Sequence, residues 1–413
     1  MTLFEFLSIV YNWGWVVLPF ILFPVWKELW LAYVRKIYVE NVEWATLELK
    51  IPQAVERTPK AMEQVFAGLH SIKSSANFKE KWWDGKHQLP ISMEIVSNAG
   101  AIRFFIRAPR VYQELVESQI YSQYKDAEID EVEDYAWSLP DDVPNDQYGL
   151  WGTELILTKE DAYPIRTYRF FEEPISEKKF IDPLSSLVEV LGRLTTGEQV
   201  WMQYLIRPAR DDRWQKEGRK LADKLMGKET PAKGGENAIE EVFRFLVDMV
   251  SWIWGETSQP KKEEKSKEQG GMKELSPGLK EVLGALEESI SKHGFEAGIR
   301  IVYIAKTDAF AIHTIPALLG TFKQFSTYNL NGFKPNSDVS PSVDYLFKKS
   351  REYLRKRSLY RAARLRLFVR KQVILNTEEL ATVYHIPSIM LEVPTLTRIA
   401  AKKVEPPAGL PSI

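Results

Sequence analysis

The densest group of chemically active side chains in the sequence is basic. Between Lys348 and Lys371, eleven Lys or Arg residues accompany a single acid, Glu352, which gives this stretch a local net charge of +10. Guanidinium and ammonium groups at this density are typical of contacts with nucleic-acid phosphates or anionic lipid headgroups. Aromatic residues at positions 353, 360 and 368 lie between them. The candidate contact residues are Arg355, Lys356, Arg357, Arg361, Arg364, Arg366, Arg370 and Lys371.

The same stretch fits a second interpretation, in which it is a solvated amphipathic helix. Leu354, Leu359, Ala362 and Leu365 recur at helical spacing and would then face a core, while the charged side chains point to water. The pattern leaves both interpretations open.

The sequence offers no set of residues for catalysis or metal binding. It has no cysteine, which excludes disulfides, thiolate metal sites and cysteine nucleophiles. None of the five histidines stands three or four residues from another, as a metal pair on a helix face requires. Ala305-Lys306-Thr307 follows a predicted strand, as the end of a phosphate-binding loop does, but the glycines of that loop are missing. We therefore expect no enzymatic activity, no cofactor and no metal.

The composition bounds the architecture that must position the basic residues. With 413 residues, 45% of them apolar, the chain is long enough for two or three folded units. Its 55 Lys and Arg against 56 Asp and Glu leave a net charge of −1, so any basic surface is local. The succession of short strands and helices predicts an α+β fold with two tandem ferredoxin-like (βαββαβ) units, at residues 41–140 and 150–345.

Each unit is predicted from strands of alternating polarity separated by helices. Helices are expected to begin near Pro59, Pro109 and Pro183, and a further one covers 316–325. The strands expected in the first unit are 44–51, 91–96, 101–107 and 128–133. Those expected in the second are 154–158, 199–206, 299–305 and 329–333.

An insertion at residues 208–278 splits the second unit. It contains a predicted amphipathic helix at 236–254 and a charged linker at 256–274. The helix either lies on a membrane surface or docks a partner, or it folds back on its own domain. The residues expected to make its contacts are Phe243, Leu246, Val250, Trp252, Ile253 and Trp254. Residues 346–413 form the basic helix and a C-terminal connecting segment.

The N-terminal segment is predicted to be a transmembrane anchor. Residues 6–26 contain no charge, and as a helix they span ~31 Å, close to the thickness of a hydrocarbon core. Residues 1–40 would form the anchor and a juxtamembrane segment, and the alternative is a buried core helix. The predicted anchor residues are Trp13, Trp15, Trp26, Trp30 and Lys27.

The charges that flank this segment predict its orientation. Lys27, Arg35 and Lys36 follow it and no basic residue precedes it. Since basic residues favour the cytoplasmic side, we expect a single-pass inner (cytoplasmic) membrane protein with its N-terminus outside and its bulk in the cytoplasm.

Several short segments resemble one bacterial family. They are Leu49–Pro52, Glu63–His70, Ile91–Val96, Leu115–Tyr124, Asp182–Leu184, Gly197–Gln203, Leu375–Thr382 and Tyr384–Pro387. Together they are similar to the membrane-anchored N-terminal region that precedes type IV secretion or conjugation ATPases, TraG-like or HerA-like, in bacteria of the candidate phyla. The resemblance covers most of the chain.

This resemblance implies a non-enzymatic scaffold that docks an ATPase at the cytoplasmic face of the membrane. Its implied partners are membrane lipids, a separately encoded ATPase, DNA and further copies of the chain. The ATPase part of such polypeptides has no counterpart in this sequence, so the motor would be a separate protein, would have been lost, or would lie outside this stretch of sequence. A second hypothesis is a membrane-tethered nucleic-acid-binding module that works without a motor.

Overall fold

The fold comes from a computed structural model of the chain. The structure describes residues 3–52, 57–171, 181–227, 276–343, 346–369, 371–387 and 398–399. For residues 3–21, 51–52 and 398–399 it describes the backbone alone.

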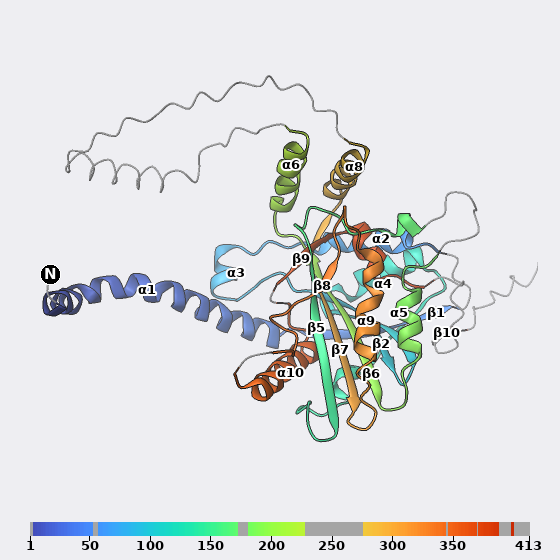
Figure 1. Cartoon of the computed structure of the whole chain (residues 1–413), viewed down its shortest axis with the longest axis horizontal. Coiled ribbons are helices and arrows are strands. Elements are labelled where there is room, and N and C mark those ends of the chain that lie inside the picture. Colours follow the sequence, from blue (N-terminus) through green and yellow to red (C-terminus); the bar gives the residue numbers. More distant parts are fainter. Residues whose placement is uncertain are drawn as a thin grey trace, which may run out of the picture.

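In this part of the chain, nine strands form one continuous antiparallel sheet, and a short strand, β10 (Arg398–Ile399), pairs in parallel with β1. The strands of the first half are β1 (Trp44–Pro52), β2 (Ile91–Asn98), β3 (Ala101–Pro109) and β4 (Glu128–Glu131). Those that follow are β5 (Tyr148–Leu157), β6 (Glu198–Pro208), β7 (Gly294–Lys306), β8 (Phe333–Pro335) and β9 (Val373–Asn376). The protein is therefore α+β, as Figure 1 shows.

The two halves of the sheet have matching strand orders. The first half runs β4-β1-β3-β2 and the second runs β6-β7-β5-β8. The halves join because β2 pairs with β6 along its whole length, from Ile91 opposite Ile206 to Asn98 opposite Gln199. The predicted fold class began with a transmembrane helix, and it is wrong because none of the described helices is long and apolar enough to cross a membrane. Two tandem units were expected, and backbone hydrogen bonds between β2 and β6 join their strands into one sheet.

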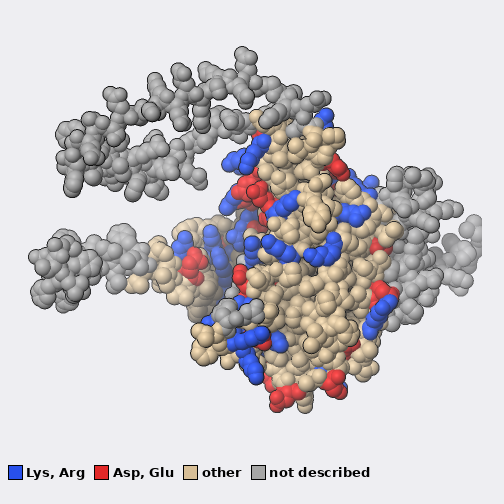
Figure 2. Space-filling view, viewed as in Figure 1, with Lys and Arg blue, Asp and Glu red and all other residues tan. Residues whose placement is uncertain are grey.

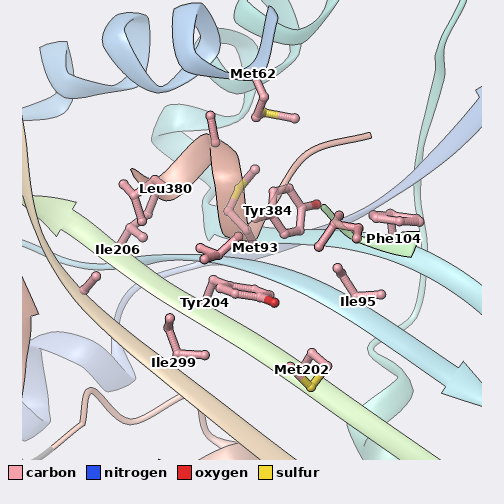
Figure 3. Close-up of a cluster of buried hydrophobic side chains, with 14 of the residues drawn as sticks. Met62, Met93, Ile95, Phe104, Met202, Tyr204, Ile206, Ile299, Leu380 and Tyr384 are labelled. Atoms are coloured by element: carbon pink, nitrogen blue, oxygen red, sulfur yellow. The ribbon is translucent and has the colours of Figure 1, made fainter. Parts of the chain in front are cut away.

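Five of the described helices pack on one face of this sheet. They are α2 (Lys60–Leu69), α4 (Gln113–Gln123), α5 (Ser185–Gly192), α9 (Thr314–Thr321) and α11 (Thr377–Val383). Apolar side chains such as Met62 on α2, Leu380 on α11 and Tyr204 on β6 are buried together there (Figure 3). Burying such a set of side chains is the main source of stability for the sheet.

The opposite face of the sheet carries a second core beneath α10 (Lys348–Arg364). Leu359, Tyr360 and Ala363 of α10 pack there against Trp201 and other buried side chains of the sheet. The hydroxyl of Tyr360 donates a 2.7 Å hydrogen bond to the carbonyl oxygen of Pro140. The helix that carries the predicted basic contacts is thus an integral part of the fold.

Two helices pack against each other beside the sheet. They are α6 (Arg213–Leu225) and α8 (Pro277–Ser291), joined by a small core around Trp214 and Leu286. Residues 228–275 between them are outside the described part of the chain, and so are the predicted helix 236–254 and linker 256–274.

The helix α1 (Leu3–Glu40) leaves the body of the protein and contacts it through its C-terminal end (Figure 1). Leu31 and Val34 are buried there, and the indole N–H of Trp30 donates a 2.8 Å hydrogen bond to the carbonyl oxygen of Trp82. Trp82 belongs to the short helix α3 (Phe78–Trp82). This contact fixes α1 next to the segment that leads into β2.

The prediction of a transmembrane anchor is wrong. Among the residues that the structure describes, none of the helices combines the length and the apolar composition that a bilayer crossing requires. Between residues 22 and 40, α1 carries five charged residues and uses part of its surface to pack on the protein. The predicted classification as a membrane protein and the predicted single-pass inner-membrane location are therefore wrong as well. Of its predicted residues, Trp26 is half exposed, Lys27 and Trp30 are half-buried, and the side chains of Trp13 and Trp15 are outside the description.

The contact between α1 and the 82–86 segment depends on a glycine. Gly85 has φ of +67°, and a Cβ placed there would lie 2.2 Å from the carbonyl oxygen of Val34. We expect Gly85→Ala to destabilise the protein by about 1–3 kcal/mol, because an L-residue is strained in this conformation and would push α1 away. Urea unfolding followed by circular dichroism measures this change.

A matched control is Gly284→Ala in α8, where nothing lies within 4 Å of the new Cβ. It should stabilise the protein by about 0.5–1 kcal/mol, because alanine favours a helix interior. Equal tolerance of both substitutions would contradict the described docking of α1.

Candidate functional site

The basic helix α10 uses several of its cations inside the protein. The guanidinium of Arg355 donates hydrogen bonds to the carbonyl oxygens of Ser337 and Ser340, at 3.0 and 2.8 Å. Arg364 is buried, forms an ion pair with Asp141 and stacks over the ring of Trp137. Both side chains are occupied by protein groups and are not available for phosphate.

Arg366 is the most fully paired of these cations. Its guanidinium lies 3.0 Å from Glu94 and 2.7 Å from Asp134, and both carboxylates accept two hydrogen bonds from it. Tyr135 also donates a 2.6 Å hydrogen bond to Glu94. Burial lowers the pKa of Arg366, but Glu94, Tyr135 and Asp134 outweigh it, so that this pKa lies well above its ordinary value. The Arg366 guanidinium thus anchors the segment after α10 to Glu94 on β2 and to Asp134.

Arg300 on β7 also binds the end of α10 and the segment that follows it. It is fully buried and forms a 2.8 Å ion pair with Glu154 on β5. Its other N–H groups donate to the carbonyl oxygens of Ala362 and Leu367, at 3.1 and 2.8 Å. A buried guanidinium that binds two backbone carbonyls fixes the end of α10 against the sheet.

Four of the remaining predicted cations are at least partly exposed to solvent. Arg361 and Lys371 are exposed and Lys356 and Arg357 are half-buried, whereas Arg370 is outside the described residues. Within the described part, none of these four has a carboxylate within 4 Å. Figure 2 shows Lys and Arg side chains gathered over α10. These positions stay candidate phosphate contacts.

A second basic surface, which the sequence analysis missed, is a cavity of about 410 Å³ between α1, α3 and the end of β6. No Asp or Glu is among its lining residues. They are Arg35, Lys73, Ser74, Ser75, Ala76, Lys81, Lys86, His87, Gln88, Pro208 and Arg210. We call this the cationic cavity. Figure 2 shows Lys and Arg side chains gathered where α1 meets the body of the protein.

The pairing of β2 with β6 creates this cavity. Ile91 at the start of β2 lies opposite Ile206 near the end of β6. Because the strands are antiparallel, the residues just before β2 come next to those at the end of β6. His87 and Gln88 therefore lie beside Pro208 and Arg210, although 120 residues separate the two segments in the sequence.

Local hydrogen bonds hold the walls of the cavity. The side-chain oxygen of Gln88 accepts hydrogen bonds from the N–H and the hydroxyl of Ser74, at 2.8 and 3.2 Å. Asn77 and Glu80 form a capping box at the start of α3, and Glu80 also pairs with Lys86 at 2.9 Å. These contacts fix the segment that carries Lys81 and Lys86 in the wall of the cavity.

Burial, and repulsion among the positive charges in and around the cavity, lower the pKa of two groups there. Burial lowers the pKa of His87, and the charges of Arg35, Arg207 and Arg210 lower it further, against the carbonyl oxygen of Gly85, which raises it. Burial likewise lowers the pKa of Arg207, with Arg210 and Arg35 acting in the same direction against Glu296. Groups that disfavour each other's charge in this way create a positive potential, which attracts anions.

Few carboxylates neutralise this potential. Glu296 is shared by Arg207, at 2.6 Å, and Arg210, at 3.7 Å. Among the described residues, Arg35, Lys73 and Lys81 have no ion pair with a carboxylate. Cations and serine hydroxyls in a hollow of this size can bind phosphate groups by charge-assisted hydrogen bonds.

The segment after α10 reaches the same end of β6. The ring of Phe368 lies under the guanidinium of Arg207, 4.2 Å from it, and Gln372 accepts a 3.0 Å hydrogen bond from Arg207. Arg207 thus links this segment to the end of β6, next to the cavity residues Pro208 and Arg210.

The fold and the site define an α+β protein with one continuous sheet and a cationic cavity at the junction of its halves. A family model described as a domain of unknown function (DUF8128) matches residues 27–398. The chain belongs to this family. Among curated proteins, no sequence matches it. The resemblance to the region that precedes type IV secretion ATPases stays a prediction.

The buried ion pairs give a test of the structural role of Arg366. We expect Arg366→Met to cost about 3–5 kcal/mol of unfolding free energy, because it leaves Glu94 and Asp134 buried without their partner. The exposed neighbour Arg361 offers a matched control, and Arg361→Met should change stability by at most about 0.5 kcal/mol. Urea unfolding measures both, and equal stabilities would contradict the described network.

Proposed function

We propose that this protein is a non-enzymatic nucleic-acid-binding platform, in which the cationic cavity and the outward face of α10 contact the phosphate backbone. The observation that carries the proposal is the lining of the cavity, which contains five Lys or Arg residues and no Asp or Glu. Lys86 and Arg210 are paired with Glu80 and Glu296 outside this lining, whereas Arg35, Lys73 and Lys81 have no ion pair with a carboxylate of the described residues. The chain as a whole has a net charge of −1, so this concentration of positive charge is local. Local basic surfaces of this kind bind phosphates and release counterions.

Nucleic acid fits this surface better than a small anion does. Beside the cavity, Arg207 contacts Phe368 and Gln372 of the segment after α10, and the basic residues of α10 precede them in the sequence. A ligand with many regularly spaced phosphates can contact all these places at once, whereas a single phosphate can contact one. The predicted docking of a separately encoded ATPase and the predicted homo-oligomer stay predictions, because phosphate binding bears on neither.

The proposal is tested by the binding of fluorescein-labelled oligonucleotides, followed by fluorescence anisotropy at several KCl concentrations. Affinity should fall steeply with salt, and each of Arg35→Ala and Lys81→Ala should reduce the slope of the log–log plot by about one, since each removes one phosphate contact. The matched controls are Lys323→Ala and Lys334→Ala, exposed lysines on the other half of the sheet.

Three results would contradict the proposal, of which two concern the oligonucleotide itself. One is an absence of binding at low salt. The other is binding that the two control variants weaken as much as Arg35→Ala and Lys81→Ala do. Competition by inorganic phosphate at the same phosphate concentration as the oligonucleotide would also contradict it, because the ligand would then be a small anion.

The cavity histidine predicts a pH dependence of binding. The pKa of His87 lies below its ordinary value of 6.5, so the ring is neutral at pH 7 and gains a proton as the pH falls below 6.5. A bound polyanion favours the charged ring, and affinity should therefore rise as the pH falls from 7 toward 5. His87→Asn should flatten this part of the curve. Identical pH profiles for the two proteins would show that His87 does not face the ligand.

A further inference from the structure

We infer that the preferred ligand is single-stranded nucleic acid, whose bases stack on an exposed aromatic surface next to the cationic cavity. This inference deepens the proposed function and rests on it. The aromatic surface consists of Phe23, Trp26, Tyr33, Phe78 and Trp83.

A connected series of ring contacts through Trp30 links Phe23, Trp26, Tyr33 and Trp83. Phe78 packs separately against Trp82 within α3. Phe23 and Trp26 have ring centroids 5.7 Å apart, and Trp26 stacks on Trp30 at 6.1 Å with an interplanar angle of 14°. Trp83 meets Trp30 edge-on at 6.2 Å. Because Trp30 is fixed by its hydrogen bond to the carbonyl oxygen of Trp82, the series is held in place on the protein.

These rings are far more exposed than packing in the protein requires. The exposed fraction is 50% for Trp26, 63% for Trp83 and 76% for Phe78. Contiguous exposed apolar surface is uncommon on a folded protein and marks a binding site when polar residues border it. The neighbouring cationic cavity favours an anionic ligand that also has flat apolar faces.

The same two helices carry both kinds of group. On α1, Arg35 lines the cavity while Trp26 and Tyr33 belong to the aromatic surface. On α3, Lys81 lines the cavity and Phe78 is exposed one turn earlier. The chain continues from α3 through Trp83 to Lys86, another cavity residue. A strand whose phosphates enter the cavity thus has its bases within reach of the rings.

This combination distinguishes a single strand from a duplex. In a duplex the base faces are already stacked on each other, so that only phosphates are available to a surface of this kind. An unpaired strand offers each base face to an aromatic ring, in addition to its phosphates. The aromatic surface should therefore add affinity for single strands and leave duplex affinity unchanged.

The experiment compares a labelled 20-residue oligothymidylate with a labelled 20-base-pair duplex, using fluorescence anisotropy and the full chain. We expect the single strand to bind more tightly, and Trp83→Ala to weaken its binding about tenfold without changing that of the duplex. Trp83→Tyr should restore most of the affinity, because it restores an aromatic face. The matched control is Tyr328→Ala, a fully exposed aromatic residue on the second half of the protein.

The outcomes separate this inference from the proposed function. If the duplex binds as tightly as the strand, and Trp83→Ala and Phe78→Ala change neither while Arg35→Ala and Lys81→Ala weaken both, the inference is overturned and the proposed function stands. If neither nucleic acid binds, both fall. Circular dichroism of each variant keeps a loss of folding from being counted as a loss of binding.

Discussion

The pairing of β2 with β6 is the contact on which the rest of the molecule depends. It joins two half-sheets of matching strand order into one sheet, through eight consecutive residue pairs from Ile91–Ile206 to Asn98–Gln199. The same register places His87 and Gln88 beside Pro208 and Arg210. The cationic cavity thus lies at the junction of the halves, and its walls come from both. A shift of one residue in this pairing would turn every side chain of β2 to the other face and dismantle the cavity.

Positive charge has two separate uses in this protein. On the face of the sheet beneath α10, Arg300 and Arg366 are buried in full ion pairs with Glu154, Glu94 and Asp134. Removing one partner of such a pair is costly, so these cations hold the fold together. Around the cavity, Arg35, Lys73 and Lys81 remain near water without a carboxylate, and their potential extends outward. The number of basic residues in a stretch of sequence does not distinguish these two uses.

Local elements of the fold could be predicted from the sequence, while its long-range contacts could not. The predicted strands 44–51, 91–96 and 101–107 lie in β1, β2 and β3. Segment 44–51 alternates with a period of two, which is typical of a strand. Nothing in β2 or β6 alone shows that the two strands pair, so separate units were expected instead of one sheet. The cavity was missed for the same reason, because its cations come from three segments that are distant in the sequence. The densest basic run was visible, but the burial of Arg364 and Arg366 depends on Asp141, Glu94 and Asp134, more than 200 residues away.

The central claim is that nucleic acid binds at the junction of the two half-sheets. Hydrogen–deuterium exchange of the full chain, with and without a saturating oligonucleotide, tests it most directly because it locates the ligand. The account predicts slower exchange of backbone amides in residues 73–88 and at the end of β6, with α8 and β8 unchanged. Protection confined to other regions, or none at a concentration where binding is complete, would contradict it.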